Sequence, residues 1–334
     1  MLSEYGSTHL EIESFSDWDY RFINQSELDP PYAVFSKTLS GFGDYVREEQ
    51  PDLIVIHGDR IEAFAGALVG VMNNTLVAHV EGGEVSGTID DSYRHAISKL
   101  AHIHFVSNQD ALARLLQLGE DKESVHVVGS PELDLMNSSQ LPTLNLVREK
   151  YEIPYVEYGV VIFHPVTSEH EKAREQAELL ASALIESRKN FVVIESNNDL
   201  GSKAIRQVFD KLKVLDSFRV LPSMRFEYFL VLLKNATFMI GNSSSGVREA
   251  PHYGVPAINL GSRQLGRIKS SLVLNCEFDQ KDILKSIERS LLLPREPQSN
   301  FGTGESSKLF GEVVSSGSIW STPIQKIFRN VRLQ

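Results

Sequence analysis

Two acidic residues follow directly on short apolar runs in the first third of the chain. Asp59 comes after the run 53–56, and Glu81 comes after the run 76–80. Apolar runs of this length that alternate with helical patterns predict strands of a parallel sheet buried on both faces. Open α/β sheets bind ligands outside the carboxyl ends of their strands, and carboxylates positioned there can act as general acids and bases. We therefore predict that Asp59 and Glu81 carry out acid–base chemistry.

A second acidic pair, Asp90 and Asp91, stands just before a helical pattern in the same stretch. We place both residues with the acids above as candidate catalytic groups. His57 and His79 lie within or next to the predicted strands, and we interpret them as structural residues that orient Asp59 and Glu81.

The stretch 241–250 follows another predicted strand and is rich in serine. Backbone N–H groups and the hydroxyls of Ser243 and Ser244 would converge there on an anion such as a phosphate. Glu249, one turn further on, could reach a ribose hydroxyl. The alternative is a serine cluster that only caps a helix.

Four more residues could complete a binding site. His164 ends a predicted strand of the second half, or is only a histidine held by the following turn. Arg263 and Arg267 could add positive charge to a diphosphate, or form surface ion pairs. Phe229 fits a core position at helical spacing, but it could also stack on a base.

Composition excludes several classes of protein. The 334 residues carry a formal net charge of −11 and an isoelectric point near 5.4, which argues against a general nucleic-acid binder. The single cysteine, Cys276, cannot form an internal disulfide, and no Cys/His cluster has the spacing of a zinc site. No apolar run is long enough to span a membrane, so we expect a cytoplasmic protein without a membrane partner.

Alternation of strand and helix patterns continues through the chain and predicts an α/β fold of two Rossmann-like, doubly wound domains facing a cleft. Predicted strands cover residues 53–56, 76–80, 103–106, 125–128, 160–163, 191–195, 219–221, 237–240 and 257–260. A long helix is predicted over residues 169–188. We place the domains at 1–145 and 146–334, with a turn-rich boundary from residue 136, and expect the last helix to pack back on the first domain.

The chain resembles the hydrolysing UDP-N-acetylglucosamine 2-epimerases, the family of the sialic-acid and legionaminic-acid pathways. The similarity covers nearly the whole chain, and its most specific motifs are EGGEVSGTIDDSYRH (81–95) and GNSSSGVRE (241–249). HGDR (57–60) and FHPVTSE (163–169) add to it. The resemblance implies two Rossmann-like domains of the glycosyltransferase-B type.

The resemblance also implies roles for individual residues. One set has catalytic roles: Asp59, Glu81, Asp90, Asp91 and His164. A second set binds the nucleotide: Arg60, Phe229, Ser243, Ser244, Glu249 and Arg263. No metal or other cofactor is expected. The implied partner is a nucleotide sugar, and the implied assembly is a homodimer or homotetramer.

The implied reaction is hydrolytic epimerisation. UDP-N-acetylglucosamine, or a UDP-2,4-diacetamido-trideoxyhexose, loses its C2 proton and UDP to give a 2-acetamidoglucal, and water then adds to yield N-acetylmannosamine or the corresponding 2-epimer. The alternatives are a non-hydrolysing epimerase, a glycosyltransferase of the same fold, and a truncated UDP-sugar-binding protein without turnover.

The beginning of the chain departs from the family pattern. Members open with a strand, a Gly-Thr-Arg-type loop and a helix, whereas this sequence begins with a segment that in them follows that unit. We therefore expect the first strand to be missing, and the sheet to be less stable and the protein less active than in a version extended upstream.

Overall fold

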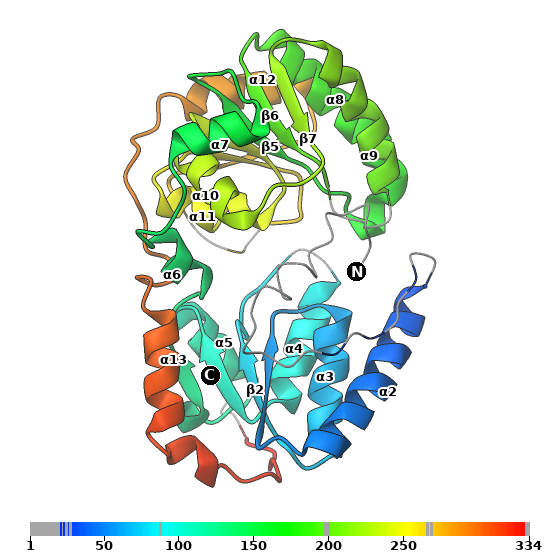
Figure 1. The fold of residues 1–334 in the computed structure, drawn as a ribbon, viewed down its shortest axis with the longest axis vertical. Helices are drawn as coiled ribbons and strands as arrows, with labels where there is room; N and C mark the ends of the chain where they lie inside the picture. The colour runs from blue at the N-terminus through cyan, green and yellow to red at the C-terminus, as the bar shows by residue number, and fades with distance from the viewer. Residues whose placement is uncertain are drawn as a thin grey trace. The chain divides into compact units, whose positions relative to one another are not determined.

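A computed structural model describes residues 21, 23, 26, 29–86, 89–196, 201–264, 267 and 270–330. The chain divides into two compact units. It passes from the first unit to the second after Asp134 and returns to the first unit at Phe301. Figure 1 shows helices and strands alternating through both.

The first unit is built on a parallel sheet whose strands follow the order β1-β2-β3-β4. Its strands are β1 (Leu53–His57), β2 (Leu76–Val80), β3 (Ile103–Val106) and β4 (Val125–Val127). Its helices are α2 (Pro31–Glu49), α3 (Ile61–Met72), α4 (Asp90–Leu100), α5 (Gln109–Gln117), α6 (Glu132–Met136, which crosses into the second unit) and α13 (Ser306–Ser315), with the 3₁₀ turns η2 (Lys122–Ser124) and η6 (Ser318–Ser321).

Helices pack on both faces of this sheet. Helices α2 and α3 pack on the face that carries Ile54 and Val77. Helix α13, drawn in orange in Figure 1, packs on the opposite face, where Phe310 lies 4.5 Å from Phe105 between ring centroids. Alternate residues of the same strands face the two layers, which explains why the strands carry apolar residues on both faces.

A distant carboxylate holds the start of α13. Asp134 accepts hydrogen bonds from the backbone N–H groups of Ser306 (2.7 Å) and Ser307 (2.6 Å). The first N–H groups of a helix have no partner within the helix, so an acidic side chain at this end satisfies them and also interacts favourably with the helix dipole. The last helix is thereby fixed to the first unit.

The second unit contains a six-stranded parallel sheet in the order β10-β9-β8-β5-β6-β7. Its strands are β5 (Gly159–Ile162), β6 (Phe191–Ile194), β7 (Phe218–Leu221), β8 (Phe238–Gly241), β9 (Ala257–Leu260) and β10 (Val273–Cys276). Its helices are α7 (Leu144–Tyr151), α8 (Ala173–Glu186), α9 (Ser202–Phe209), α10 (Phe226–Lys234), α11 (Glu249–His252) and α12 (Gln280–Ser290), with the 3₁₀ turns η3 (Thr167–Lys172), η4 (Asp210–Val214) and η5 (Ser244–Gly246).

Strand order reverses between β5 and β8, which are neighbours in this sheet. One face packs on α8, α9 and α12 through a cluster that includes Phe191 and Leu184, and Figure 1 shows α7, α10 and α11 on the other side. In doubly wound sheets the point of reversal is where the loops on the two sides separate and leave room for a ligand.

The structure differs from the sequence-based elements at several places. The long helix expected from residue 169 begins at Ala173, because Glu169 has non-helical angles (φ −125°, ψ 21°). Helix α7 lies just beyond the turn-rich segment and is capped by the Thr143 hydroxyl, which accepts from Leu146 N. Strand β10 was not predicted at all. Among the described residues no helix is long and apolar enough to cross a membrane.

Candidate functional site

Asp59 lies in the turn after β1, and a buried histidine fixes this turn. His79 Nε2 donates to the carbonyl oxygen of Gly58 (2.9 Å), while Nδ1 accepts from the Ser98 hydroxyl (3.1 Å). The proton is assigned to Nε2 because a carbonyl oxygen can only accept a hydrogen bond. Burial lowers the pKa of His79 to about 3, so the ring is neutral at pH 7. His79 thus supports the turn that carries Asp59, while its expected role in orienting Asp59 and Glu81 stays a prediction.

A buried arginine reaches Asp59 from α4. Arg94 Nη2 donates to Asp59 Oδ2, and the Arg94 side chain is only 4% exposed. A guanidinium in such a place requires a carboxylate partner, since an unpaired buried charge is strongly destabilising. Asp59 is therefore held from two sides, by the turn that His79 supports and by Arg94.

Glu81 follows β2 and lies at the same edge of the sheet as Asp59. Its Oε2 is 3.3 Å from His57 Nε2, and its Oε1 accepts from the Ser130 hydroxyl at 2.7 Å. The same hydroxyl also contacts Glu132 Oε2. The backbone of Glu81 has φ +66°, a left-handed conformation that is uncommon outside glycine and costs about 1–3 kcal/mol. Such strain persists where surrounding contacts enforce it, often at functional sites.

The glycines after Glu81 are required by close packing. Gly83 has φ +75°, and a Cβ atom there would lie 2.3 Å from the carbonyl oxygen of Ala111. The chain therefore passes directly over the start of α5, which brings Glu84 within 2.8 Å of the Ser107 hydroxyl. A larger residue at position 83 would displace the whole turn.

The other predicted residues of the first unit lie at helix starts. Asp90 and Asp91 are the first two residues of α4, where the helix dipole favours negative charge. Asp91 Oδ2 lies 3.7 Å from His95 Nε2. Arg60 precedes α3, is mostly exposed, and lies 3.7 Å from Glu62.

In the second unit the loops after β5 and β8 are joined by a buried amide. Asn242 Oδ1 accepts from the backbone N–H of His164 (2.7 Å), and Asn242 Nδ2 donates to the carbonyl oxygen of His164 (2.8 Å). Gly241 makes the approach possible, because a Cβ atom there would lie 1.8 Å from the carbonyl oxygen of Ile162. His164 is thus fixed at the point where the strand order reverses.

The serine stretch forms a tighter turn than the helix start expected from the sequence. Ser243 caps the three-residue turn η5, its hydroxyl accepting from Ser245 N at 3.3 Å, and Ser244 begins that turn. The α-helical segment α11 is only four residues long. Arg263 Nη1 donates to the carbonyl oxygen of Asn242 at 3.1 Å, so its guanidinium lies beside the serines.

Two predicted nucleotide ligands are buried. Glu249, at the start of α11, is close enough to Tyr253 to contribute to the raised pKa of that phenol, although burial is the larger cause. Phe229 lies in α10 and stacks on Phe226 with ring centroids 6.2 Å apart.

A comparison with known protein families shows which family the chain belongs to. The family model described as UDP-N-acetylglucosamine 2-epimerase matches residues 2–315. The chain belongs to this family. The expected glycosyltransferase-B type of fold is confirmed by the solved structure described in the next paragraph.

Individual members of the UDP-N-acetylglucosamine 2-epimerase family are clearly similar. A UDP-N-acetylglucosamine 2-epimerase of Neisseria meningitidis serogroup B is 44% identical over 339 residues, covering 100% of this chain and 89% of the relative. A hydrolysing UDP-N,N'-diacetylbacillosamine 2-epimerase of Legionella pneumophila is 33% identical, covering 81% and 72%. A crystal structure of a UDP-GlcNAc 2-epimerase from Neisseria meningitidis, bound to UDP-GlcNAc, superposes with a TM-score of 0.80 at 18% identity, covering 93% and 90%.

Sequence reasoning missed several residues around the family motifs. Arg94 stands within the 81–95 motif, but its contact with Asp59 spans 35 positions and could not be found from local spacing. Asn242 stands within the serine motif. Ser130 and Glu132 follow the predicted strand 125–128, but the contact of Ser130 with Glu81 could not have been predicted, because β4 is remote from β2 in sequence.

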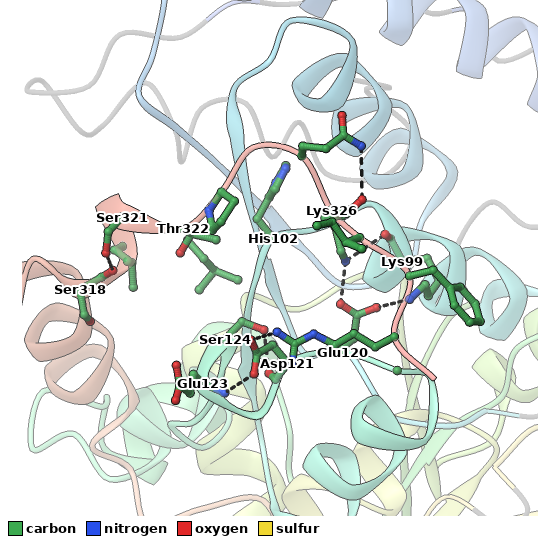
Figure 2. A pocket seen from close by; sticks show the side chains of 18 of the residues that line it. Lys99, His102, Glu120, Asp121, Glu123, Ser124, Ser318, Ser321, Thr322 and Lys326 are labelled. Atoms are coloured by element: carbon green, nitrogen blue, oxygen red, sulfur yellow. Dashed lines mark hydrogen bonds and ion pairs between the residues drawn. The ribbon is translucent and has the colours of Figure 1, made fainter. Parts of the chain in front are cut away.

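A cavity of about 620 Å³ lies in the first unit away from the predicted residues. It is lined by the segment before β4 and by residues 318–329, at the amino ends of β3 and β4, whereas Asp59 and Glu81 follow carboxyl ends. Figure 2 shows Glu120 in this cavity with the amines of Lys99 and Lys326, each 2.6 Å away.

Glu120 is a fully neutralised carboxylate. Burial alone would raise the pKa of Glu120, but hydrogen bonds from His104, Lys326 and Lys99 outweigh it and lower the pKa to about 2. Lys326 also donates to the carbonyl oxygens of Lys99 (3.0 Å) and Ala101 (2.5 Å). This network fastens the segment after α13 to the sheet.

Proposed function

We propose that the protein is a hydrolysing 2-epimerase that converts UDP-N-acetylglucosamine, or a UDP-2,4-diacetamido-trideoxyhexose, and water into UDP and the free 2-epimeric sugar. The observation that carries the proposal is the position of Asp59 and Glu81. Both follow the carboxyl ends of adjacent strands, and each is held by its own buried partner. The hydrolysing subtype is supported by the name of the Legionella relative.

The reaction needs two proton transfers at carbon and loss of a diphosphate. A carboxylate takes the C2 proton, the C1–O bond breaks, and UDP leaves with the electron pair to give a 2-acetamidoglucal. Water then adds across the double bond, with hydroxyl at C1 and a proton delivered to C2 from the opposite face. Asp59 and Glu81, with Asp90 and Asp91, are the groups that we assign to these transfers.

The second unit supplies the groups that we assign to UDP. Ser243, Ser244 and Arg263 offer hydroxyl and guanidinium donors to a diphosphate, and charged acceptors make such hydrogen bonds stronger than neutral ones. His164, fixed by Asn242, would face the same group. Glu249 and Phe229 are the proposed partners of the ribose and the uracil ring.

A panel of nucleotide sugars tests the proposal. The protein is incubated separately with UDP-N-acetylglucosamine, a UDP-diacetamido sugar and its GDP counterpart, and the products are identified by ¹H and ³¹P NMR. We expect free UDP and an equal amount of the free 2-epimer from one UDP-sugar. A UDP-linked epimer would instead indicate a non-hydrolysing enzyme, and UDP-sugar binding without turnover would indicate a binding protein.

We also propose that the protein acts in the cytoplasm as a homodimer or homotetramer, in line with the sequence. Light scattering after size-exclusion chromatography gives the molar mass directly. A monomeric mass at micromolar concentration would contradict the assembly.

A further inference from the structure

The proposed ribose ligand, Glu249, stands on a very short helix. Helix α11 has only four residues, Glu249–His252, and Glu249 is the first of them. A single helical turn is not stable by itself, because forming it costs more conformational entropy than its few hydrogen bonds return. The orientation of α11, and with it the position of the Glu249 carboxylate, must therefore be set by contacts with other parts of the second unit.

Tyr253, the residue directly after α11, makes one such contact. Its backbone N–H donates to the carbonyl oxygen of Glu249 at 3.2 Å, so Tyr253 lies one turn after Glu249. Its hydroxyl donates to the carbonyl oxygen of Met136 at 3.0 Å. Burial is the main cause of the raised pKa of this phenol, so the hydroxyl keeps its proton and remains a donor at pH 7.

His252, the last residue of α11, makes a second contact with the same segment. Its Nε2 donates to Asn137 Oδ1 at 3.1 Å, since an amide oxygen can only accept. Met136 and Asn137 follow Leu135, the residue at which the chain enters the second unit. The entering segment and α11 are therefore joined by two adjacent side chains.

The segment by which the chain leaves the second unit also contacts α11. The backbone N–H of Gln298 donates to the carbonyl oxygen of Pro251 at 2.9 Å, and the Gln298 amide donates to the Ser271 hydroxyl at 2.9 Å. Gly254 lies against the same segment, because a Cβ atom there would be 2.7 Å from the carbonyl oxygen of Arg295. The entering and the leaving segment thus both hold the end of α11.

These contacts border a cavity of the second unit. The cavity has a volume of about 480 Å³, and its lining includes Met136, Asn137, His252, Tyr253 and Gln298. A side chain beside a cavity has packing partners on one side only, so it makes fewer van der Waals contacts than a core side chain. The hydrogen bonds of Tyr253 and His252 therefore have a large share in holding α11 to the entering segment.

We propose that Tyr253 and His252 are positioning residues, which direct Glu249 at the ribose by holding α11 to the segment 136–137. The inference rests on the proposed role of Glu249 as the ribose ligand. Neither side chain needs to touch the nucleotide, since each acts through the helix that carries the carboxylate. Binding of the ribose hydroxyls, and not of the rest of the nucleotide, should therefore depend on Tyr253.

Calorimetry on the full chain with UDP and with 2′,3′-dideoxy-UDP tests this role. Tyr253→Phe removes only the hydroxyl that contacts Met136. We expect this variant to bind UDP about three- to tenfold more weakly, the size of one net hydrogen bond, and to bind the dideoxy analogue within about twofold of the unmodified protein. A tyrosine that only supports the fold would weaken the binding of both ligands alike.

A double-mutant cycle shows whether Tyr253 acts through Glu249. Glu249→Gln should weaken UDP binding and spare the dideoxy analogue, and adding Tyr253→Phe to it should then change little. Additive losses would overturn the proposal. If Glu249→Gln leaves the preference for UDP over the analogue unchanged, Glu249 does not bind the ribose and the positioning role falls with it. Release of UDP from the nucleotide sugar then shows separately whether the proposed reaction stands.

Matched variants serve as controls. Tyr155→Phe removes another tyrosine hydroxyl of the second unit that donates to a backbone carbonyl, that of Asp216 at 2.8 Å, and should bind both ligands as the unmodified protein does. Gln140→Ala, at an exposed position shortly after Asn137, should also leave both affinities unchanged.

Asn137→Ala provides a second route to the same contact. It removes the acceptor of His252 at an exposed position, where a substitution has little effect on folding, so it carries the test if Tyr253→Phe fails to fold. We expect UDP binding to weaken by about twofold or more, with the dideoxy analogue unaffected. An equal ratio of the two affinities in Tyr253→Phe, Asn137→Ala and their controls would overturn the proposal.

Discussion

Glu81 and Glu120 are both carboxylates with nearly inaccessible side chains in the first unit, but their surroundings differ. Glu120 has two amines and an imidazole around it, so its charge is balanced by nearby side chains. Glu81 lies beside a half-exposed histidine, a serine hydroxyl and the second carboxylate of Glu132. The comparison shows how a buried carboxylate held by cations can stabilise a fold, while one beside a half-exposed histidine and a second acid is placed as a candidate for chemistry.

Removing the acids at the accessible edge should have the largest effect. Glu81→Gln, Asp59→Asn and Asp90→Asn should each lower turnover by about 100-fold or more, the usual contribution of a positioned acid or base. Steady-state release of UDP measures turnover, and circular dichroism checks that each variant is folded. Near-normal turnover in any of them would remove that residue from the mechanism.

Replacing Glu120 should lower the stability of the protein but leave its turnover nearly unchanged. Glu120→Gln leaves the two amines at its position without a carboxylate and should lower the free energy of unfolding by roughly 3 kcal/mol, the lower end for a broken buried pair. Turnover of the folded protein at 25 °C should stay within about twofold. Urea denaturation measures the loss, with Glu123→Gln as an exposed control expected to stay within about 0.5 kcal/mol.

Removing hydrogen-bond donors of the second unit should weaken UDP binding rather than lower the stability of the protein. Ser244→Ala and Arg263→Ala each remove a hydrogen-bond donor to a charged diphosphate and should weaken UDP binding by about 1.5–3 kcal/mol. Calorimetric titration with UDP measures the change. Unchanged affinity would leave Ser244 as the first residue of the turn η5 and Arg263 as a support of the Asn242 backbone, with no role in UDP binding.

The smallest expected effect concerns His79. Its folded-state pKa of about 3 lies below the ordinary value of 6.5, so between these values the unfolded chain binds a proton that the native protein does not. Stability from this residue is fully present above pH 6.5 and is lost as the pH falls towards 3, by at most about 1.4 kcal/mol per pH unit. His79→Gln, which can still donate to Gly58, should show a shallower decrease between pH 6.5 and 5 in urea titrations. An identical slope in both proteins would contradict a neutral buried His79.

Much of the sheet architecture follows from local sequence. Residues 76–80, 103–106 and 257–260 are strands at the predicted bounds, because continuous apolar runs between turns have few alternative structures. Strand β10 was missed because its residues are mostly half-exposed and lack a clear apolar pattern. The kink at Glu169 shortened the helix predicted from that residue, since helical periodicity does not reveal where the first turn begins.

Candidate acids could likewise be found from their positions after strands, whereas their partners could not. Arg94 reaches Asp59 across 35 positions, and Ser130 reaches Glu81 across 49. Such contacts depend on which strands are neighbours in the sheet, and local spacing does not contain that information. For the same reason the sequence did not predict the contact between Glu120 and Lys326, which lie 206 positions apart.

Solvent deuterium at C2 of the product tests the central claim, that carboxylates at the accessible edge of the first unit move the C2 proton. The reaction is run in D₂O with UDP-N-acetylglucosamine or the UDP-sugar that turns over, and the product is examined by ¹H NMR. The account predicts complete loss of the C2 proton signal in the free 2-epimer, with UDP released in equal amount, and product formation at least about 100-fold slower in Glu81→Gln. Retention of the original C2 proton in the product, at any rate of turnover, would contradict it.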